Sequence, residues 1–216
     1  MNRNPVLYDY WRSSASYRVR IALNLLGLET ELRAVNLLTR ANQTEDYLSM
    51  NPQGLLPTLV IDGKHLTQSL AIIEYLHATT KGSKLLPEEI DGQYQVRQLA
   101  YAIAMEIHPV CNLSVAKHVS ELTGGGDETK VNWMRHFISK GLTAFEGLLQ
   151  ETDGPFCFGD QPTMADCCLI PQLYNADRWG VDTTGFARIE TVRKTTDGLE
   201  PFRAAHPDAV GAPPAE

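Results

Sequence analysis

The sequence predicts a small α/β domain with a mixed sheet, followed by a domain that consists of helices alone. In the first eighty residues, short apolar runs typical of strands alternate with stretches of helical periodicity. From residue 91 onward the apolar residues recur with a helical period throughout. Between these parts, residues 82–90 are rich in small, polar and turn-forming side chains. We therefore expect one domain over residues 1–81, a linker over 82–90 and a second domain over 91–216.

The first domain begins with a strand–helix–strand unit. Residues 6–10 and 31–36 have the composition of strands, and a helix is expected over 15–26, with Gly27 supplying the stop. The apolar residues of this helix follow the i, i+3, i+4, i+7 spacing at Val19, Ala22, Leu23 and Leu26. Residues 39–49 form a polar stretch in which no element is expected.

A hairpin and a helix complete the first domain. Residues 58–61 and 64–67 have the composition of two strands, and Asp62-Gly63 between them is a pair typical of tight hairpin turns. Residues 69–78 follow with the pattern of a helix. The order βαβ followed by ββα predicts a mixed sheet on which helices pack.

Long apolar stripes dominate the second domain. One consists of Val96, Leu99, Ala100, Ile103 and Ile107, and another of Val131, Met134, Ile138, Leu142, Phe145 and Leu149. Pro109 follows the first stripe and is expected to kink its helix. Thr163 and Asp166 have the spacing of a capping box, which predicts the start of a third helix. The chain from Pro207 is rich in Pro, Ala and Gly, and we expect it to be loose.

The composition argues against several classes of function. The formal net charge is −7 at pH 7, which disfavours nucleic acid and anionic membranes as partners, because both attract basic surfaces. No apolar run resembles a signal peptide or approaches the length of a membrane span. No pair among Cys111, Cys157, Cys167 and Cys168 has the C-x-x-C spacing that indicates zinc or a redox couple. We therefore expect a cytoplasmic protein with buried thiols and no metal site.

The segment Arg12-Ser13-Ser14 lies between the first strand and the first helix. A helix start offers unpaired N–H groups and a partial positive charge, and serine hydroxyls there can donate to an anion. An ordinary thiol has a pKa near 8.5, and a helix N-terminus can lower it by roughly two units, which makes most of it thiolate at neutral pH. The spacing leaves two interpretations open: the serines stabilise a bound thiolate, or they only cap the helix.

Two further polar segments belong to the same domain. Leu56-Pro57 precedes a strand, where a proline can simply form a turn. The pattern also resembles the cis-proline loop of thioredoxin-like domains, whose exposed backbone pairs with a peptide-like ligand. Gln68 and Ser69 begin the next helix, as cap residues or as a site for a carboxylate. Together with the serines, these segments predict a site for a small acidic peptide that carries a thiol.

Four segments carry a resemblance to a known family. They are residues 12–23 (RSSASYRVRIAL), 68–76 (QSLAIIEYL), 112–115 (NLSV) and 171–178 (PQLYNADR). The sequence resembles the zeta class of glutathione transferases over residues 6–207, and the first and last segments are the most specific to that class. The resemblance implies a thioredoxin-like N-terminal domain followed by the helical C-terminal domain of glutathione transferases.

The resemblance also implies roles in glutathione binding. Ser13 would hydrogen-bond the glutathione sulfur, and Ser14 would support the helix start. Leu56 would pair through its backbone, Gln68 and Ser69 would hold the γ-glutamyl end, and Gln43 is a weaker candidate for the glycyl end. The helical domain would contribute His108, Asn112, Leu113 and Ser114.

The activity that the resemblance implies is the glutathione-dependent isomerisation of maleylacetoacetate to fumarylacetoacetate, a step in tyrosine and phenylalanine breakdown. The thiolate adds to the conjugated double bond, the adduct rotates about the new single bond, and elimination returns the thiolate. Arg12 and Arg178 would bind the substrate carboxylates, because an acidic protein needs fixed positive charge to hold a dianion. A homodimer is also expected.

Two positions depart from the pattern of the class. Ala15 stands where many members carry a cysteine, so the nucleophile must be glutathione itself. His108 stands where animal relatives carry glutamine, and it is either a structural residue or a ligand contact that makes the site sensitive to pH. Arg18 and Arg20 are expected to be surface or ion-pair residues.

Two other functions stay open. Isomerisation of the shorter maleylpyruvate needs the same chemistry, and His108-Pro109 favours it, whereas Asn112-Leu113-Ser114 favours maleylacetoacetate. A non-catalytic binding module with the same fold would have lost the segment around Ser13. That segment is complete here apart from Ala15.

Overall fold

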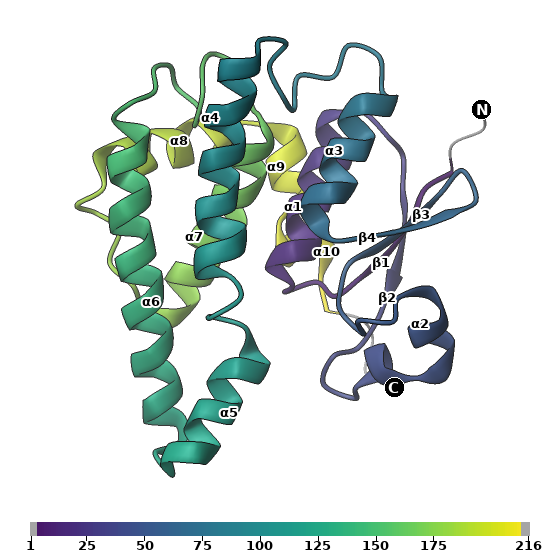
Figure 1. Ribbon diagram of the computed structural model, residues 1–216, viewed down its shortest axis with the longest axis vertical. Helices are drawn as coiled ribbons and strands as arrows, with labels where there is room; N and C mark the ends of the chain where they lie inside the picture. The colour runs from purple at the N-terminus through teal and green to yellow at the C-terminus, as the bar shows by residue number, and fades with distance from the viewer. Residues whose placement is uncertain (1–3, 213–216) are drawn as a thin grey trace. The chain divides into compact units, whose positions relative to one another are not determined.

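The computed structural model describes residues 4–212, which divide into two compact units (Figure 1). The first unit contains the described residues up to Leu85 together with those from Asp197 onward, and the second is Leu86–Thr196. The break after Leu85 lies inside the segment 82–90 that was expected to be the linker. The C-terminal segment belongs to the first unit by its contacts, although the sequence placed it in the helical domain. Within the described residues, no helix is both long and apolar enough to cross a bilayer.

The first unit is built on a four-stranded mixed sheet in the order β2-β1-β3-β4. The strands are β1 (Val6–Asp9), β2 (Glu31–Ala34), β3 (Thr58–Ile61) and β4 (Lys64–Thr67). β2 runs parallel to β1, whereas β3 is antiparallel to β1 and to β4. The central strands contribute the fully buried Leu7 and Leu59 to the core. The predicted mixed sheet is therefore confirmed.

Helices α1 (Ser14–Leu25) and α3 (Ser69–Thr79) lie together on one side of the sheet, and α2 (Glu45–Met50) lies on the other (Figure 1). α2 follows a single 3₁₀ turn, η1 (Ala41–Gln43), in the stretch where the sequence indicated no element. Its start is nevertheless well formed, because the Thr44 hydroxyl accepts from the Tyr47 N–H. Six residues are too few for a helical period to be visible in the sequence.

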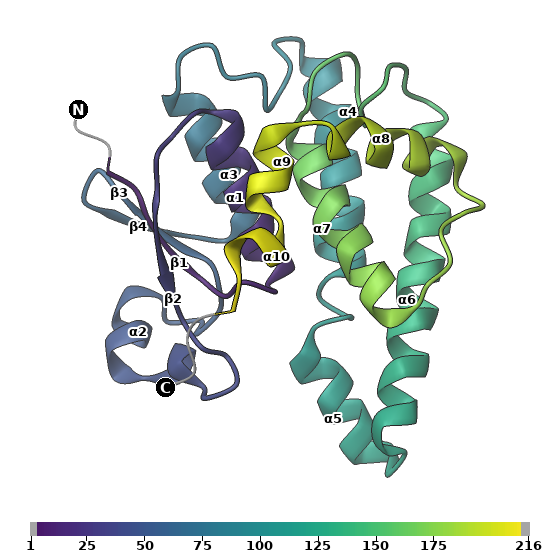
Figure 2. The same ribbon diagram turned by 180° about the vertical axis from the view of Figure 1, so that it is seen from behind.

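Two short C-terminal helices follow, of which the first packs onto α1 and the second onto the first (Figure 2). They are α9 (Glu200–Ala205) and α10 (Pro207–Val210). Pro207, expected to begin a loose tail, is buried, and the His206 ring meets the Tyr17 ring edge-on with the centroids 6.0 Å apart. The expectation of a loose chain from Pro207 is wrong up to Val210. Pro207 occupies the first position of a helix, which its fixed φ favours.

The second unit consists of helices, as predicted. They are α4 (Ile90–Tyr101), the π-helical segment η2 (Ala102–Ile107), α5 (Leu113–Thr123), α6 (Gly126–Leu149), α7 (Met164–Trp179) and α8 (Ala187–Asp197). The apolar stripes of α4–η2 and α6 face the core, where Ile103 and Phe145 are fully buried. The predicted capping box is present at the start of α7, where the Thr163 N–H donates to Asp166 Oδ2 at 2.7 Å.

The first long helix departs from regularity before Pro109, not at it. Its last six residues form the π-helical segment η2, and the His108 N–H reaches back five residues to the Ile103 carbonyl at 2.9 Å. Ile107 packs against α6 where Gly141 has no side chain, and a Cβ on that glycine would overlap Ile107. The widened turn therefore lies against a neighbouring helix that the local sequence could not reveal.

Candidate active site

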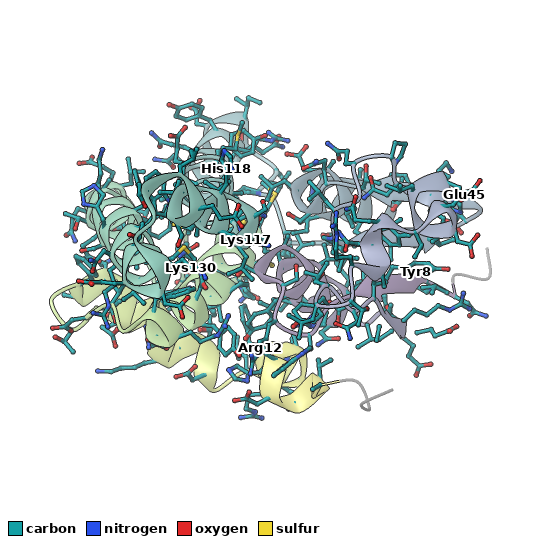
Figure 3. All side chains as sticks on the ribbon, turned by 90° about the horizontal axis from the view of Figure 1, so that it is seen from below. Tyr8, Arg12, Glu45, Lys117, His118 and Lys130 are labelled. Carbon is teal, nitrogen blue, oxygen red and sulfur yellow. The ribbon has the colours of Figure 1, made fainter. Side chains whose placement is uncertain are left out.

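The strand register gathers several predicted site segments at one edge of the sheet. Tyr8, next to the end of β1, is paired with Thr58 at the start of β3, and Thr58 is paired with Thr67 at the end of β4. The turn that follows β1, the loop that precedes β3 and the residues that follow β4 therefore leave the sheet at the same edge. Figure 3 labels Tyr8 in β1 and Arg12 in the turn that follows it.

Ser13 is the N-cap of α1, and Ser14 is the first residue inside the helix. The Ser16 N–H donates to Ser13 Oγ at 3.2 Å. Because this bond uses an oxygen lone pair, the Ser13 hydroxyl proton stays available for a bound anion. The two interpretations left open for this residue, capping and thiolate binding, are therefore compatible. The expected support of the helix start comes from Ser13, whereas Ser14 makes no capping bond within the described part of the chain.

The loop before β3 is held by hydrogen bonds to its carbonyl groups. The donors are side chains of α2 and of the residues that follow it. The Leu55 carbonyl accepts hydrogen bonds from the Tyr47 hydroxyl and the Asn51 amide, both at 2.7 Å. Burial raises the pKa of Tyr47, which keeps its phenol protonated as a donor. The peptide bond between Leu56 and Pro57 is cis. Among the described residues, the backbone N–H and C=O of Leu56 have no hydrogen-bond partner, so they can pair with a peptide-like ligand.

Two glutamines predicted for the site contact the same loop. The Gln43 amide donates to the Gly54 carbonyl at 3.1 Å. The Gln68 amide donates to Gln53 Oε1 at 2.8 Å, and both of these side chains are exposed. Gln53 was not singled out as a site residue in the sequence analysis. It lies in a turn-rich run, and its proximity to Gln68 follows only from the strand pairing.

Ser69 begins α3 and is supported by a buried cation. Arg18 Nη1 donates to Ser69 Oγ at 3.3 Å, and only 2% of Arg18 is exposed. The possibility that Arg18 is a surface residue is therefore wrong, because α1 and α3 pack together over it. The N-terminus of α3 already carries a partial positive charge, so this guanidinium adds to a positive local field. Such a field suits a carboxylate.

Arg12 and Arg178 share a feature that fits anion binding. Each stacks on the aromatic ring of a neighbour: Arg12 lies 4.1 Å from the Trp11 ring centroid, and Arg178 lies 5.9 Å from that of Tyr174. Both are exposed, and within residues 4–212 neither pairs with a carboxylate. The acidic neighbour of Arg178, Asp177, pairs with Arg193 instead. The guanidinium donors of Arg12 and Arg178 are therefore available to a ligand.

The predicted site residues of the second unit, other than Arg178, lie in one turn between η2 and α5. Asn112 is the N-cap of α5, and its Oδ1 accepts from the N–H and the hydroxyl of Ser114 at 2.9 and 2.8 Å. Leu113 is 58% exposed, and His108 closes the last turn of η2. Trp133 of α6 fixes this turn, because its indole N–H donates to the Val110 carbonyl at 2.8 Å.

The thiols of the protein are unsuited to nucleophilic chemistry. All four cysteines are free and buried. Burial raises the pKa of Cys111 to about 11, and it raises those of Cys157 and Cys167 well above the usual value. All four belong to the second unit, whereas α1 belongs to the first and carries Ala15, 9% exposed, at its start. A thiolate at this helix start must therefore come from a ligand.

Comparison with known proteins identifies the family. A model of the glutathione S-transferase N-terminal domain matches residues 5–78, and a model of the C-terminal domain matches 138–208. Maleylacetoacetate isomerase of Rhizobium meliloti is 52% identical over 209 residues, which are 96% of this chain and 98% of that protein. The thioredoxin-like and helical domains that the sequence predicted are confirmed by this match.

Solved structures of related proteins match the fold over nearly the whole chain. A holo structure of maleyl pyruvate isomerase, a bacterial zeta-class glutathione S-transferase, is 38% identical with a TM-score of 0.92, and the match covers 98% of this chain and 100% of that one. Maleylacetoacetate isomerase from Anaeromyxobacter dehalogenans with bound GSH is 39% identical with a TM-score of 0.88, covering 98% and 99%. It has also been solved with bound dicarboxyethyl glutathione and citrate. The chain therefore belongs to the zeta class of the glutathione transferases.

Proposed function

We propose that this protein is a glutathione-dependent cis–trans isomerase that converts maleylacetoacetate to fumarylacetoacetate. The observation that carries the proposal is that two groups able to bind a ligand, the Ser13 hydroxyl and the Leu56 backbone, leave the sheet at the same edge. Ser13 caps α1 through its oxygen and keeps its proton, and the Leu56 backbone has no hydrogen-bond partner among residues 4–212. A small peptide with a thiol can use both groups. Relatives of high identity carry the name of this isomerase, which supports the choice of substrate.

Glutathione fits the residues of the first unit. We infer that Leu56 pairs with its backbone, that Gln68 and Ser69 hold its γ-glutamyl end, and that Gln43 faces its glycyl end. Bound there, glutathione would supply the thiolate that adds to the double bond of the substrate and leaves again after rotation. The Ser13 hydroxyl donates to that sulfur. A pKa lowered by two units corresponds to about 2.7 kcal/mol, which a hydroxyl donor and a helix N-terminus can supply together.

Two arginine side chains bind the second ligand, the substrate. Arg12 and Arg178 bind the carboxylates of the substrate, because both present donors that no acid of the described chain occupies. Asn112, Leu113, Ser114 and His108 form the part of the second unit that contacts the ligands. Fixed arginines of this kind stabilise the negative charge that moves onto the substrate during the reaction.

Maleylpyruvate is the second candidate substrate. The presence of His108 favours it, and a maleyl pyruvate isomerase is among the solved structures that this chain resembles. The purified protein should be assayed with each substrate, with and without glutathione. We expect no turnover of either substrate without glutathione and a higher kcat/KM for maleylacetoacetate with it. Undiminished isomerisation in glutathione-free buffer would overturn the mechanism, and a preference for maleylpyruvate would reassign the substrate.

A homodimer is part of the proposal. Four large apolar side chains are exposed along α4 and η2, namely Ile90 (71%), Tyr94 (64%), Tyr101 (37%) and Met105 (59%). Their spacing of four, seven and four residues places them in one stripe of the helix surface. A second copy of this chain would bury such a stripe. Sedimentation of wild type and Tyr94→Asp tests this, and a wild-type monomer would refute it.

A reducing compartment such as the cytoplasm is the location that we propose. Its support is the state of the four cysteines, all of which are free thiols within the core. Buried reduced thiols are the usual condition of cysteine in cytosolic proteins. Fractionation of cells that express the tagged protein would test the assignment.

A further inference from the structure

Arg20 is a buried cation in the second turn of α1. It is 3% exposed, as is Asp9 at the end of β1. Arg20 Nη1 donates to both carboxylate oxygens of Asp9, at 2.7 and 2.9 Å. The expectation of an ion pair is confirmed, and the alternative of a surface residue is wrong. A buried pair of this kind needs further hydrogen bonds to satisfy its remaining donors.

Those further bonds connect three segments of the first unit. Arg20 Nη2 donates to the Trp11 carbonyl at 3.0 Å, and Arg20 Nε donates to the Ala205 carbonyl at 3.0 Å. One guanidinium thus ties α1 to the end of β1, to the turn after β1 and to the end of α9. The fork of five donors on arginine makes this possible.

The bond to Trp11 lies at the centre of the turn that leads into the candidate site. The Ser13 N–H closes this turn on the Tyr10 carbonyl at 2.7 Å, which leaves Trp11 and Arg12 as its two central residues. Arg20 therefore fixes the peptide that joins these central residues. Ser13 follows directly as the N-cap, and the Arg12 side chain lies over the Trp11 ring. The directions of both functional side chains depend on this peptide.

We propose that Arg20 is a positioning residue for the reaction, which sets the Ser13 hydroxyl against the bound thiol by holding the turn between β1 and α1. The proposal rests on the function proposed above, in which that hydroxyl stabilises a glutathione thiolate. The action of Arg20 is geometric, because its charge is neutralised by Asp9. Other groups around it are the Tyr17 ring, 5.2 Å from the guanidinium, and His206 behind that ring.

The substitution Arg20→Lys separates geometry from charge. Lysine keeps the positive charge for Asp9, but its single nitrogen cannot reach three separate acceptors as the guanidinium does. We expect the pKa of the bound glutathione thiol to rise by about one unit, which corresponds to a roughly tenfold smaller thiolate-to-thiol ratio at neutral pH. The value of kcat at pH 7 should fall by a similar factor, and part of the loss should return at higher pH. The KM for glutathione should change by less than about twofold, because its peptide contacts lie elsewhere.

The matched control is Asn24→Ala. Asn24 also ties α1 to the C-terminal segment, since its amide donates to the Pro201 carbonyl at 3.0 Å, but it does not reach the turn. The thiolate absorbance of bound glutathione is titrated against pH at a temperature where circular dichroism shows each variant to be folded. We expect the Asn24→Ala titration to match wild type. A variant Asp9→Asn/Arg20→Gln, which removes both buried charges together, provides the same test if Arg20→Lys does not fold.

The outcomes are distinct. A raised thiol pKa in Arg20→Lys with a wild-type titration in Asn24→Ala supports the proposal. Wild-type titrations in both the lysine and the double variant would overturn it, and so would an equal shift in Asn24→Ala, which would assign the effect to the C-terminal segment. A wild-type protein that binds glutathione without lowering its thiol pKa would instead overturn the proposed function.

Discussion

The hydroxyl group of Ser13 can act as a hydrogen-bond acceptor and as a donor at the same time. Its oxygen accepts from the Ser16 N–H, and its proton is free to bind an anion. A serine at this position thus stabilises the helix and the proposed thiolate together. Replacement by alanine would remove both effects, so the two have to be separated by the choice of substitution.

Ser13→Gly and Ser13→Ala make that separation possible. Glycine is tolerated at an N-cap at a cost of a few tenths of a kcal/mol, whereas alanine costs about 1 kcal/mol. We therefore expect Ser13→Ala to be less stable than Ser13→Gly in urea unfolding. Both should raise the pKa of bound glutathione equally, and their loss of turnover should shrink as the pH rises. Ser14→Ala is the control and should leave the thiol titration unchanged, because the cap is Ser13.

Arg178 tests whether the second unit binds the substrate. A charge-assisted hydrogen bond to a carboxylate contributes roughly 1.5–3 kcal/mol, which is about 10- to 150-fold in an equilibrium. Arg178→Ala should raise the substrate KM on that scale and leave the Kd of glutathione nearly unchanged. Arg178→Lys should recover only part of the loss, because it lacks the two-pronged geometry. Arg203→Ala, at an exposed arginine that pairs with Glu200, should leave both constants unchanged.

At the scale of elements, periodicity predicted the long helices, because each buries a stripe that recurs in the sequence, and the Asp62-Gly63 pair predicted the hairpin. It did not predict α2, α9 and α10, which have four to six residues each and therefore no measurable period. The π-helical turn was also missed, because the glycine that Ile107 packs against, Gly141, lies in another helix. The candidate site shows the same limit. Ser13, Leu56 and Gln68 follow from motifs, whereas the contacts of Gln53, Arg18 and Arg20 follow from strand pairing and helix packing.

Two glycines in α6 test the origin of the π-helical turn. A Cβ at Gly141 would overlap Ile107, whereas one at Gly147 would meet open space. We expect Gly141→Ala to destabilise the protein by about 1–3 kcal/mol through overpacking. Gly147→Ala should stabilise it by up to about 1 kcal/mol, because alanine is the better helix former. Thermal unfolding measures the stability of both variants. Equal changes in stability would show that η2 does not depend on the contact between Ile107 and Gly141.

For the whole molecule, stability depends on pH through its buried carboxyls. Burial raises the pKa of Asp166 in the second unit and that of Asp9 in the first, the latter against the opposing charge of Arg20. A carboxyl with a raised folded pKa binds its proton more tightly in the folded protein. Its contribution to stability is complete below the unfolded pKa of about 3.9, and it is lost as the pH rises through the folded pKa.

The comparison of wild type with Asp166→Asn measures this contribution. The variant cannot titrate at this position, so we expect the stability advantage of wild type to shrink as the pH rises from about 4. Urea unfolding at several pH values gives the difference. Asp182→Asn is the control with the opposite sign. The N–H and hydroxyl of Thr184 lower the pKa of Asp182, so its contribution is lost as the pH falls through the folded pKa. An advantage over Asp166→Asn that grows with pH would contradict the prediction.

The return of the C-terminal segment to α1 has a consequence for the synthesis of the chain on the ribosome. The carbonyl acceptors of Arg20 and Asn24 in α9 are made only after the whole of Leu86–Thr196. At typical elongation rates this interval lasts on the order of ten seconds. During it, the nascent first unit lacks the helix α9 that packs onto α1, although its sheet is already complete. Its folding therefore ends only after this interval, which makes the nascent N-terminal half a candidate client for chaperones.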